Sequence, residues 1–272
     1  MQFDRKLVVR VGGAIVAAIV LGLYQLMVGG FGGSDQPKPE TRSSTPVVAE
    51  QTTADEPTRS TPTPARSTRS DLPAPQGEFD YYVLVLSWSP THCSGRAGRG
   101  RDDDMQCRSG RPFGFVLHGL WPQYERGYPQ ACESDEPREV SSSNMDRALK
   151  VAPSENLVQH EWEKHGTCAG LAQDDYFSTA IAAYSSVAVP STYKLPAEPI
   201  ETTPDDVREA FLAANNSLSE DDVSATCSRN ELAEVWVCLD KSLKPRACSA
   251  DVAKRHCGAR HVRMRAVRGD WP

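Results

Sequence analysis

The distribution of apolar residues after residue 76 predicts several strands separated by helices. Alternating or continuous apolar runs, which are typical of strands, lie at 81–88, 113–117, 233–239 and 262–267. Helical periodicity predicts helices at 174–187 and 205–215, the second with Thr203 as N-cap and Pro204 at its first position. Strands at both ends with helices in the middle do not give the strict alternation of a doubly wound sheet. We therefore expect an α+β fold, with a central antiparallel sheet flanked by helices.

The first 34 residues have the pattern of a membrane segment. Three basic residues precede a stretch from Val11 to Ser34 that has no formal charge and is rich in apolar residues up to Val28. This stretch is long enough to span a bilayer as one helix, and its basic flank favours a cytoplasmic N-terminus. We expect an uncleaved signal anchor with a transmembrane helix within residues 1–34, and a cleaved signal peptide is the alternative.

The composition changes again at 35–76, which is rich in Pro, Ser, Thr, Glu and Arg and has almost no aromatic or long aliphatic residue. Such a segment cannot bury enough surface to offset its ordering entropy, so we expect a disordered linker. Residues 77–272 are enough for one catalytic domain with a sizeable core. The anchor would hold this domain on the periplasmic or extracellular side of the membrane, whereas signal cleavage would secrete it.

All eight cysteines lie within 77–272. An even number of cysteines in a chain sent out of the cytoplasm predicts disulfides. A zinc cluster is the competing use of cysteine, but the sequence contains no C-x-x-C spacing. Spacing alone leaves on the order of a hundred pairings open.

Two histidine segments carry the candidate chemistry, HGLWP starting at His118 and HEWEKHGTC starting at His160. Cleavage of RNA by its own 2′-hydroxyl needs one group to remove a proton, a second to protonate the leaving 5′-oxygen, and cations to hold the phosphorane charge. Histidine suits both proton transfers at mildly acidic pH, and His118 and His165 are our candidates for them. The other histidines, which lie outside any motif and are assigned no role, are His92, His256 and His261.

The second segment is predicted to be a helix. Ser154 can cap the free N–H groups in front of Glu155, and Gly166 supplies a stop after His165. On this helix one turn separates the members of two pairs, His160 with Lys164 and Glu161 with His165. We expect these side chains to form one polar stripe that a phosphate could contact.

The same segment superficially resembles the H-E-x-x-H helix of zinc proteases, in which two histidines four positions apart bind one metal. Here Lys164 occupies the fourth position, and its ammonium would repel the ion. The next histidine lies about 140° around the helix from the first. We therefore expect a reaction that uses neither a metal nor another cofactor.

HGLWP at 118–122 and HEWEKHGTC at 160–168 resemble the two active-site segments of the ribonuclease T2 family of acid endoribonucleases. The run YYVLVLSWSPTHC at 81–93 resembles the first strand and turn of that family, and the likeness spans about residues 78–268. The chain departs from the family after HGLWP, where it has Gln123, and before the second segment, where it has Leu157 and Val158. Base preference is therefore the property that transfers least.

The resemblance implies that His165 is the base and His118 the acid, although an exchange of the two roles would leave the reaction unchanged. It implies that Glu161 and Lys164 stabilise the pentacovalent phosphate. Two further residues match family positions, namely His160, which would hold the phosphate, and Trp121, which would stack on a base. It also implies four disulfides: Cys93 with Cys107, Cys132 with Cys168, Cys227 with Cys257, and Cys238 with Cys248.

Single-stranded RNA is commonly read by stacking its bases on aromatic rings. On the loop expected after His118 the candidates are Trp121, Tyr124 and Tyr128, each of which could instead serve only to pack the domain. From residue 76 onward 22 Lys and Arg stand against 29 Asp and Glu, a net charge of −7. An acidic domain does not attract RNA broadly, so binding should depend on a local cationic pocket and activity should be shifted to acidic pH.

These observations predict a metal-independent endoribonuclease, a monomer by default, that cleaves single-stranded RNA to a 2′,3′-cyclic phosphate and then to a 3′-phosphate. The alternative is a catalytically inactive module on the same scaffold that binds RNA or another surface. The presence of all the ionisable groups in the two segments favours the enzyme.

Overall fold

The computed structural model describes residues 76–95, 97–100 and 104–271. The predicted signal anchor at 1–34 and all of the predicted linker except its last residue lie outside these residues. Among the residues that the structure describes, no helix is long and apolar enough to cross a membrane.

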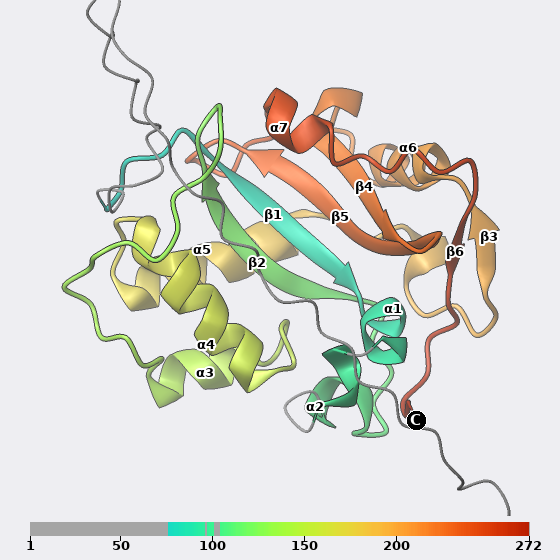
Figure 1. Ribbon diagram of the computed structural model, residues 1–272, viewed down its shortest axis with the longest axis horizontal. Coiled ribbons are helices and arrows are strands. Elements are labelled where there is room, and N and C mark those ends of the chain that lie inside the picture. Colours follow the sequence, from blue (N-terminus) through green and yellow to red (C-terminus); the bar gives the residue numbers. More distant parts are fainter. Residues whose placement is uncertain (1–75, 96, 101–103, 272) are drawn as a thin grey trace, which may run out of the picture. The chain divides into compact units, whose positions relative to one another are not determined.

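A six-stranded sheet forms the centre of the described domain (Figure 1). Its strands are β1 (Tyr81–Trp88), β2 (Phe115–Gln123), β3 (Ile200–Thr202), β4 (Val223–Ser228), β5 (Glu231–Leu239) and β6 (Val262–Met264). The order is β2-β1-β5-β6-β3, and β4 also pairs with β5. All pairs are antiparallel except β5 with β6, which meet in parallel at Glu231 and Arg263.

The α+β class and the flanking helices are confirmed, but the sheet is mixed and not the antiparallel sheet that we expected. Parallel strands need a long crossover connection. The segment between β5 and β6 provides one and contains α7 (Ala250–Ala253). The apolar pattern marks strands but carries no information about the direction in which a distant strand pairs.

Strands β1 and β5 lie close to the predicted ranges, and β6 ends earlier than predicted. Strand β2 begins later than predicted and continues through HGLWP, so Trp121 lies on a strand and not on a loop. Strands β3 and β4 were not predicted, because their short sequences IET and VSATCS lack a sustained apolar run.

Both faces of β1 are covered, which explains its unbroken apolar run. Tyr82, Leu84, Leu86 and Trp88 point into the main core, whereas the intervening Tyr81, Val83 and Val85 pack in a second cluster on the other face.

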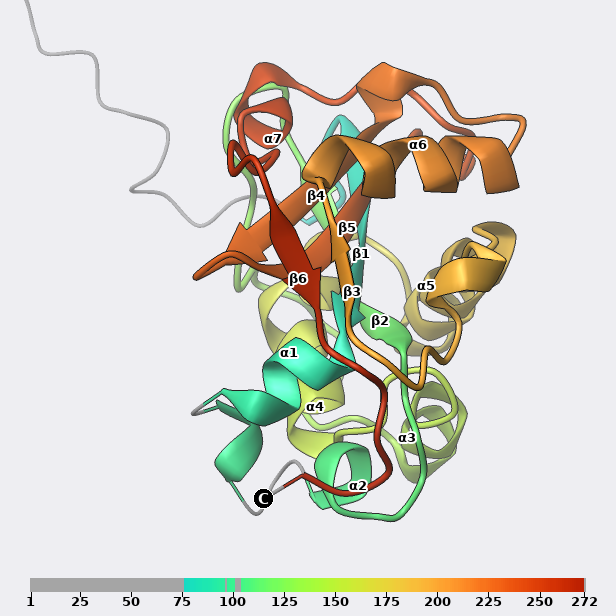
Figure 2. The ribbon, with the colours of Figure 1, turned by 90° about the vertical axis from the view of Figure 1, so that its right-hand side faces the viewer.

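The longer helices pack around the sheet. α4 (Glu155–Lys164) and α5 (Gln173–Ser186) contact β2, α5 also contacts β1, and α3 (Ser142–Ala148) packs on both helices. On the side of β4, α6 (Pro204–Ala214) and α7 complete the domain (Figure 2). The predicted cap of α6 is confirmed, since the Thr203 side chain accepts a hydrogen bond from Asp206 N at 3.0 Å.

All four disulfides form as the resemblance implies. Cys93–Cys107 links α1 (Ser89–Ser94) to α2 (Asp104–Cys107), and Cys132–Cys168 links the segment after β2 to the turn after α4. The other two join β4 and β5 to the segments around α7. Each bridge stabilises the domain by about 2–4 kcal/mol, mainly by restricting the unfolded chain.

Candidate active site

Helix α4 carries the second histidine segment and begins as predicted. The Ser154 side chain accepts a hydrogen bond from Leu157 N at 3.3 Å. The helix ends at Lys164, one residue before the predicted end, and the chain continues as a 3₁₀ turn, Gly166–Cys168. Gly166 does not stop the helix through a left-handed conformation. A Cβ at this position would collide with the ring of Trp162 and lie 2.9 Å from Tyr176 Cε1, so the glycine allows close packing.

His118 lies at a bulge in β2. Val85 pairs with Gly119 and Leu86 pairs with Leu117, so His118 has no partner on β1. A bulge of this kind redirects a side chain from the regular alternation of a strand. The His118 ring is held between two carboxylates: its Nδ1 lies 2.6 Å from Glu234 Oε1, and its Nε2 lies 3.5 Å from Glu161 Oε1.

Glu161 is the buried carboxylate of the site, with 5 % of its surface exposed. Its Oε2 accepts a hydrogen bond from Trp121 Nε1 at 2.6 Å. Burial raises the pKa of Glu161 to about 7, although His118, Trp121 and Lys164 all act to lower it. Gly119 makes room for this carboxylate, because a Cβ there would lie 2.8 Å from Glu161 Cδ and still closer to Oε2.

His165 follows α4 and is 2 % exposed. Its ring stacks on Trp121 with 4.9 Å between centroids, and Tyr128 lies 6.3 Å away. Nδ1 of His165 is buried and has no hydrogen-bond partner among the described residues. Burial, together with the positive charges of Lys164, His118 and His160, lowers the pKa of His165 to about 3.

His118 differs from His165 in its partners. Burial alone would lower the pKa of His118, but the hydrogen bond to Glu234 and the charges of Glu161 and Glu234 outweigh it. The pKa of His118 therefore lies above its ordinary value. The two histidines thus have opposite tendencies in one site, and both rings contact Trp121.

Lys164 and His160 complete the predicted set. The charge of Lys164 lowers the pKa of His118, Glu161 and His165, so its ammonium acts on all three. His160 is exposed and lines a pocket of about 350 Å3 together with His118, Ser154 and Asn156. The predicted polar stripe is thus divided between buried and exposed positions, with Glu161 and His165 covered and His160 at the surface.

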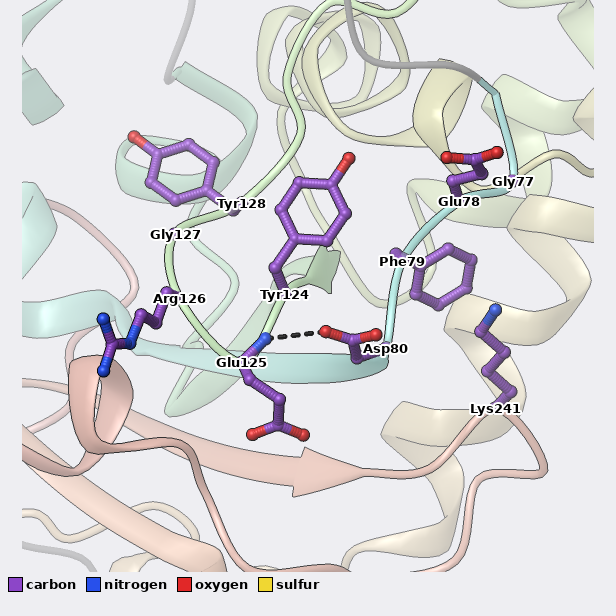
Figure 3. A pocket seen from close by; sticks show the side chains of 10 residues that line it. All are labelled: Gly77, Glu78, Phe79, Asp80, Tyr124, Glu125, Arg126, Gly127, Tyr128 and Lys241. Atoms are coloured by element: carbon purple, nitrogen blue, oxygen red, sulfur yellow. Dashed lines mark hydrogen bonds between the residues drawn. The ribbon is translucent and has the colours of Figure 1, made fainter. Parts of the chain in front are cut away.

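A second pocket, of about 1020 Å3, adjoins the aromatic residues that follow β2. Figure 3 shows the rings of Tyr124, Tyr128 and Phe79 around it. Two hydrogen bonds from main-chain N–H groups fix the turn that carries the tyrosines: Tyr124 N donates to the Gly127 carbonyl oxygen at 3.0 Å, and Glu125 N donates to the Asp80 side chain at 2.8 Å.

The structure adds residues that the sequence motifs did not indicate. Glu234 and Trp236 lie two positions apart on β5 and therefore project from the same face. His92, which we assigned no role, lines the pocket beside His118 and lowers the pKa of Glu234 through its charge. The alternation of β5 could have placed Glu234 and Trp236 on one face, but no signal in the sequence places that face beside His118.

A half-buried histidine and a fully buried one, with opposite pKa shifts, lie next to a buried carboxylate and an ammonium in a disulfide-linked α+β domain, an arrangement suited to acid–base chemistry. The family model that matches this chain, described as the ribonuclease T2 family, covers residues 79–248. The chain therefore belongs to the ribonuclease T2 family.

Curated relatives agree with this assignment, and a solved structure has the same fold. The chain is 35 % identical over 212 residues to a ribonuclease of Aeromonas hydrophila, covering 71 % of this chain and 88 % of the relative. It is 31 % identical over 181 residues to a probable ribonuclease of Haemophilus influenzae, covering 63 % and 61 %. The RNase-related protein from Calystegia sepium has the same fold, with a TM-score of 0.53, 24 % identity and coverage of 70 % and 98 %. The protein is thus a T2-type endoribonuclease.

Proposed function

We propose that this enzyme cleaves single-stranded RNA by attack of a 2′-hydroxyl on the adjacent phosphorus, with two histidines and no metal. The observation that carries the proposal is the contrast between His118 and His165, whose rings contact the same tryptophan but whose pKa values are shifted in opposite directions. Such a pair supplies one unprotonated and one protonated imidazole at the same mildly acidic pH.

In the first step neutral His165 takes the proton of the 2′-hydroxyl as the 2′-oxygen bonds to phosphorus. Protonated His118 gives its proton to the 5′-oxygen as the bond from phosphorus to that oxygen breaks. The products are a 2′,3′-cyclic phosphate and a free 5′-hydroxyl. A bound phosphate anion would raise the pKa of His165 from its low value and so strengthen the base at the moment when it acts.

In the second step the proton transfers run in reverse. His118, now neutral, takes a proton from water as the water oxygen attacks phosphorus. His165, now protonated, returns a proton to the 2′-oxygen, which leaves a 3′-phosphate. Both histidines then have the protonation states with which they started.

The remaining predicted groups stabilise the charge on the pentacovalent phosphate. Lys164 supplies a positive charge that already acts on both histidines. Glu161, with a pKa of about 7, is largely protonated at mildly acidic pH and can donate a hydrogen bond to a phosphoryl oxygen. His160, exposed at the rim of the smaller pocket, is placed to hold a phosphate.

We propose that the bases on either side of the cleaved bond occupy the two pockets. Tyr124 and Tyr128 line the larger pocket, and Tyr128 lies next to His165. Asn156 and His160 line the smaller one, beside His118. One side of the Trp121 ring stacks on His165, so a base that stacks on this tryptophan would use the opposite side.

We also propose that the catalytic domain is held on the outer side of a membrane by the N-terminal segment. The uncharged stretch from Val11 to Ser34 supports an anchor. The four disulfides support an oxidising compartment for the domain. Protease treatment of intact cells or spheroplasts, with detection of the domain, tests this placement.

The chemical proposal is tested by the ends of the RNA products. The full-length protein, purified in detergent, should cleave single-stranded RNA at pH 5–6 in the presence of a chelator and leave cyclic or 3′-phosphate ends. His118→Ala and His165→Ala should each lower kcat by about 10²- to 10⁴-fold, because each removes one proton-transfer group. A 5′-phosphate end, or an unchanged rate for both variants, would contradict the mechanism.

A further inference from the structure

The hydrogen bond between His118 and Glu234 joins two strands that are not neighbours in the sheet. His118 lies on β2 and Glu234 on β5, and β1 runs between them (Figure 1). On β1 the residue paired with Glu234 is Ser87, whose small side chain leaves space between the two partners. The bulge at His118 and the register of β5 together bring the imidazole and the carboxylate to 2.6 Å.

Both oxygens of Glu234 have a partner. Oε1 contacts His118 Nδ1, and Oε2 accepts a hydrogen bond from Trp236 Nε1 at 2.7 Å. The ring of Trp236 meets Trp121 edge-on, with 5.3 Å between centroids. Trp121 in turn donates to Glu161, so the carboxylate of Glu234 is held within the same network as the rest of the site.

We propose that Glu234 is a positioning residue for His118. The Glu234 carboxylate accepts a hydrogen bond from Nδ1–H of His118 and leaves Nε2 of that ring as the atom that exchanges a proton with RNA. This inference rests on the acid role proposed for His118. With Nδ1 occupied by Glu234, the ring can turn only Nε2 toward Glu161 and the site. The tautomer is thereby fixed in both steps of the reaction, since neutral His118 keeps its hydrogen on Nδ1.

Glu234 also keeps His118 protonated. The ionisable groups that act on His118 are Glu234 from β5 and Glu161 and Lys164 from α4, while His92 from α1 acts on Glu234. Of these, Glu234 makes the hydrogen bond with the ring. Burial acts to raise the pKa of Glu234, but the contact with His118 outweighs it and the pKa lies below its ordinary value, so Glu234 is ionised at pH 5–6. Loss of its charge should therefore lower the pH at which His118 loses its proton.

The variants Glu234→Gln and Glu234→Ala separate the effect of the hydrogen bond, which orients the ring, from the effect of the negative charge, which keeps the ring protonated. Glutamine keeps an acceptor for Nδ1–H but removes the charge, whereas alanine removes both. Glu231→Gln is the matched control, because Glu231 lies on the same strand, has the same 19 % side-chain exposure and pairs with Arg265 away from the site. Circular dichroism and urea unfolding check that each variant is folded.

The first measurement is the pH dependence of kcat on single-stranded RNA with the full-length protein. We expect the alkaline limb to move about one to two pH units toward acid in Glu234→Gln and Glu234→Ala, because the lost negative charge had favoured protonated His118. At the optimum, kcat should fall about tenfold in Glu234→Gln and about a hundredfold in Glu234→Ala, since only alanine also releases the ring. Glu231→Gln should leave both the alkaline limb of the pH profile and kcat unchanged.

The second measurement does not depend on activity. Nitrogen NMR of His118 should show the Nδ1–H tautomer in the neutral ring and a titration midpoint that shifts toward acid in Glu234→Gln. If His118 has the same titration midpoint in the wild-type protein and in Glu234→Gln, or if its neutral ring is the Nε2–H tautomer, the positioning role is wrong even if the products are cyclic phosphates. If the tautomer and the titration are as expected but the products have other ends, the proposed mechanism fails and the contact with Glu234 stands.

Discussion

Gly119 is the residue of HGLWP at which the site leaves no space for a side chain. A Cβ there would lie 2.5 Å from Trp121 Nε1, 2.8 Å from Glu161 Cδ and still closer to Oε2. The substitution Gly119→Ala must therefore displace the buried carboxylate and break its hydrogen bond with Trp121. The φ angle of Gly119 is not positive, so the expected cost comes from the collision and not from backbone strain.

The magnitude follows from two contributions. An extra carbon in a packed site costs about 1–3 kcal/mol. Loss of the hydrogen bond between Trp121 and the protonated Glu161 costs about 0.5–1.5 kcal/mol at mildly acidic pH. We expect the free energy of unfolding to fall by about 3 kcal/mol, which corresponds to a drop of about 1.5 M in the urea midpoint for an m-value of about 2 kcal/mol per M. Activity should fall by about a hundredfold, because Glu161 and Trp121 both lose their positions.

Gly258→Ala is the control, because a Cβ there meets nothing within 4 Å. The double variant Gly119→Ala with Glu161→Ala gives the sharper test, since removal of the carboxylate should relieve most of the collision. The two changes should then cost less together than the sum of their separate effects. Additive losses, or a Gly119→Ala protein as stable and active as Gly258→Ala, would refute this account of the glycine.

Three further predictions concern stability, and each is measured by urea unfolding. The pKa of His165 is about 3 in the folded protein and about 6.5 in the unfolded chain. Between these two pH values the unfolded chain binds a proton at His165 and the folded protein does not. Stability should fall from about pH 6.5 toward pH 3 by up to about 1.4 kcal/mol per unit, and His165→Gln should remove this dependence. Glu161 acts oppositely, because its pKa of about 7 gives stability that is complete below about pH 4.5 and lost as pH rises through 7; Glu161→Gln should abolish that loss. An unchanged slope in either variant would contradict the assignment. Replacement of Cys132 and Cys168 by serine should cost about 2–5 kcal/mol and lower activity, because this bridge ties the segment after β2 to the end of α4; unchanged stability would remove that role.

Local sequence signals predicted the parts of the fold that depend on neighbouring residues. The apolar run of β1 and the caps at Ser154 and Thr203 are of this kind, because hydrogen bonds and burial within a few residues decide them. The direction of β6 and the length of β2 were not predictable in this way. A strand's partner lies far along the chain, and a continuous motif such as HGLWP can lie on a strand or on a loop.

The site likewise contains residues that the neighbouring sequence indicates and one that depends on distant strand pairing. His118, Glu161, Lys164 and His165 could be selected from the sequence because they are grouped in two short segments and match the chemistry of RNA cleavage. Glu234 could not, because it lies 116 positions from His118 and reaches it only through the register of β5 and a bulge in β2. A glutamate within an alternating strand is ordinarily an exposed residue, and nothing local distinguishes this one.

Burial alone does not distinguish the two histidines, because it acts to lower the pKa of both. The difference lies in the charged groups around each ring. His118 has Glu234 and Glu161 as neighbours, whereas the groups that act on His165 are all cations, namely Lys164, His118 and His160. If the roles were exchanged, the reaction would have to start from a neutral His118 beside the ionised Glu234 and a protonated His165 among cations. The electrostatics therefore favour the role of acid that we propose for His118, and Glu234 is the carboxylate that makes the hydrogen bond with its ring.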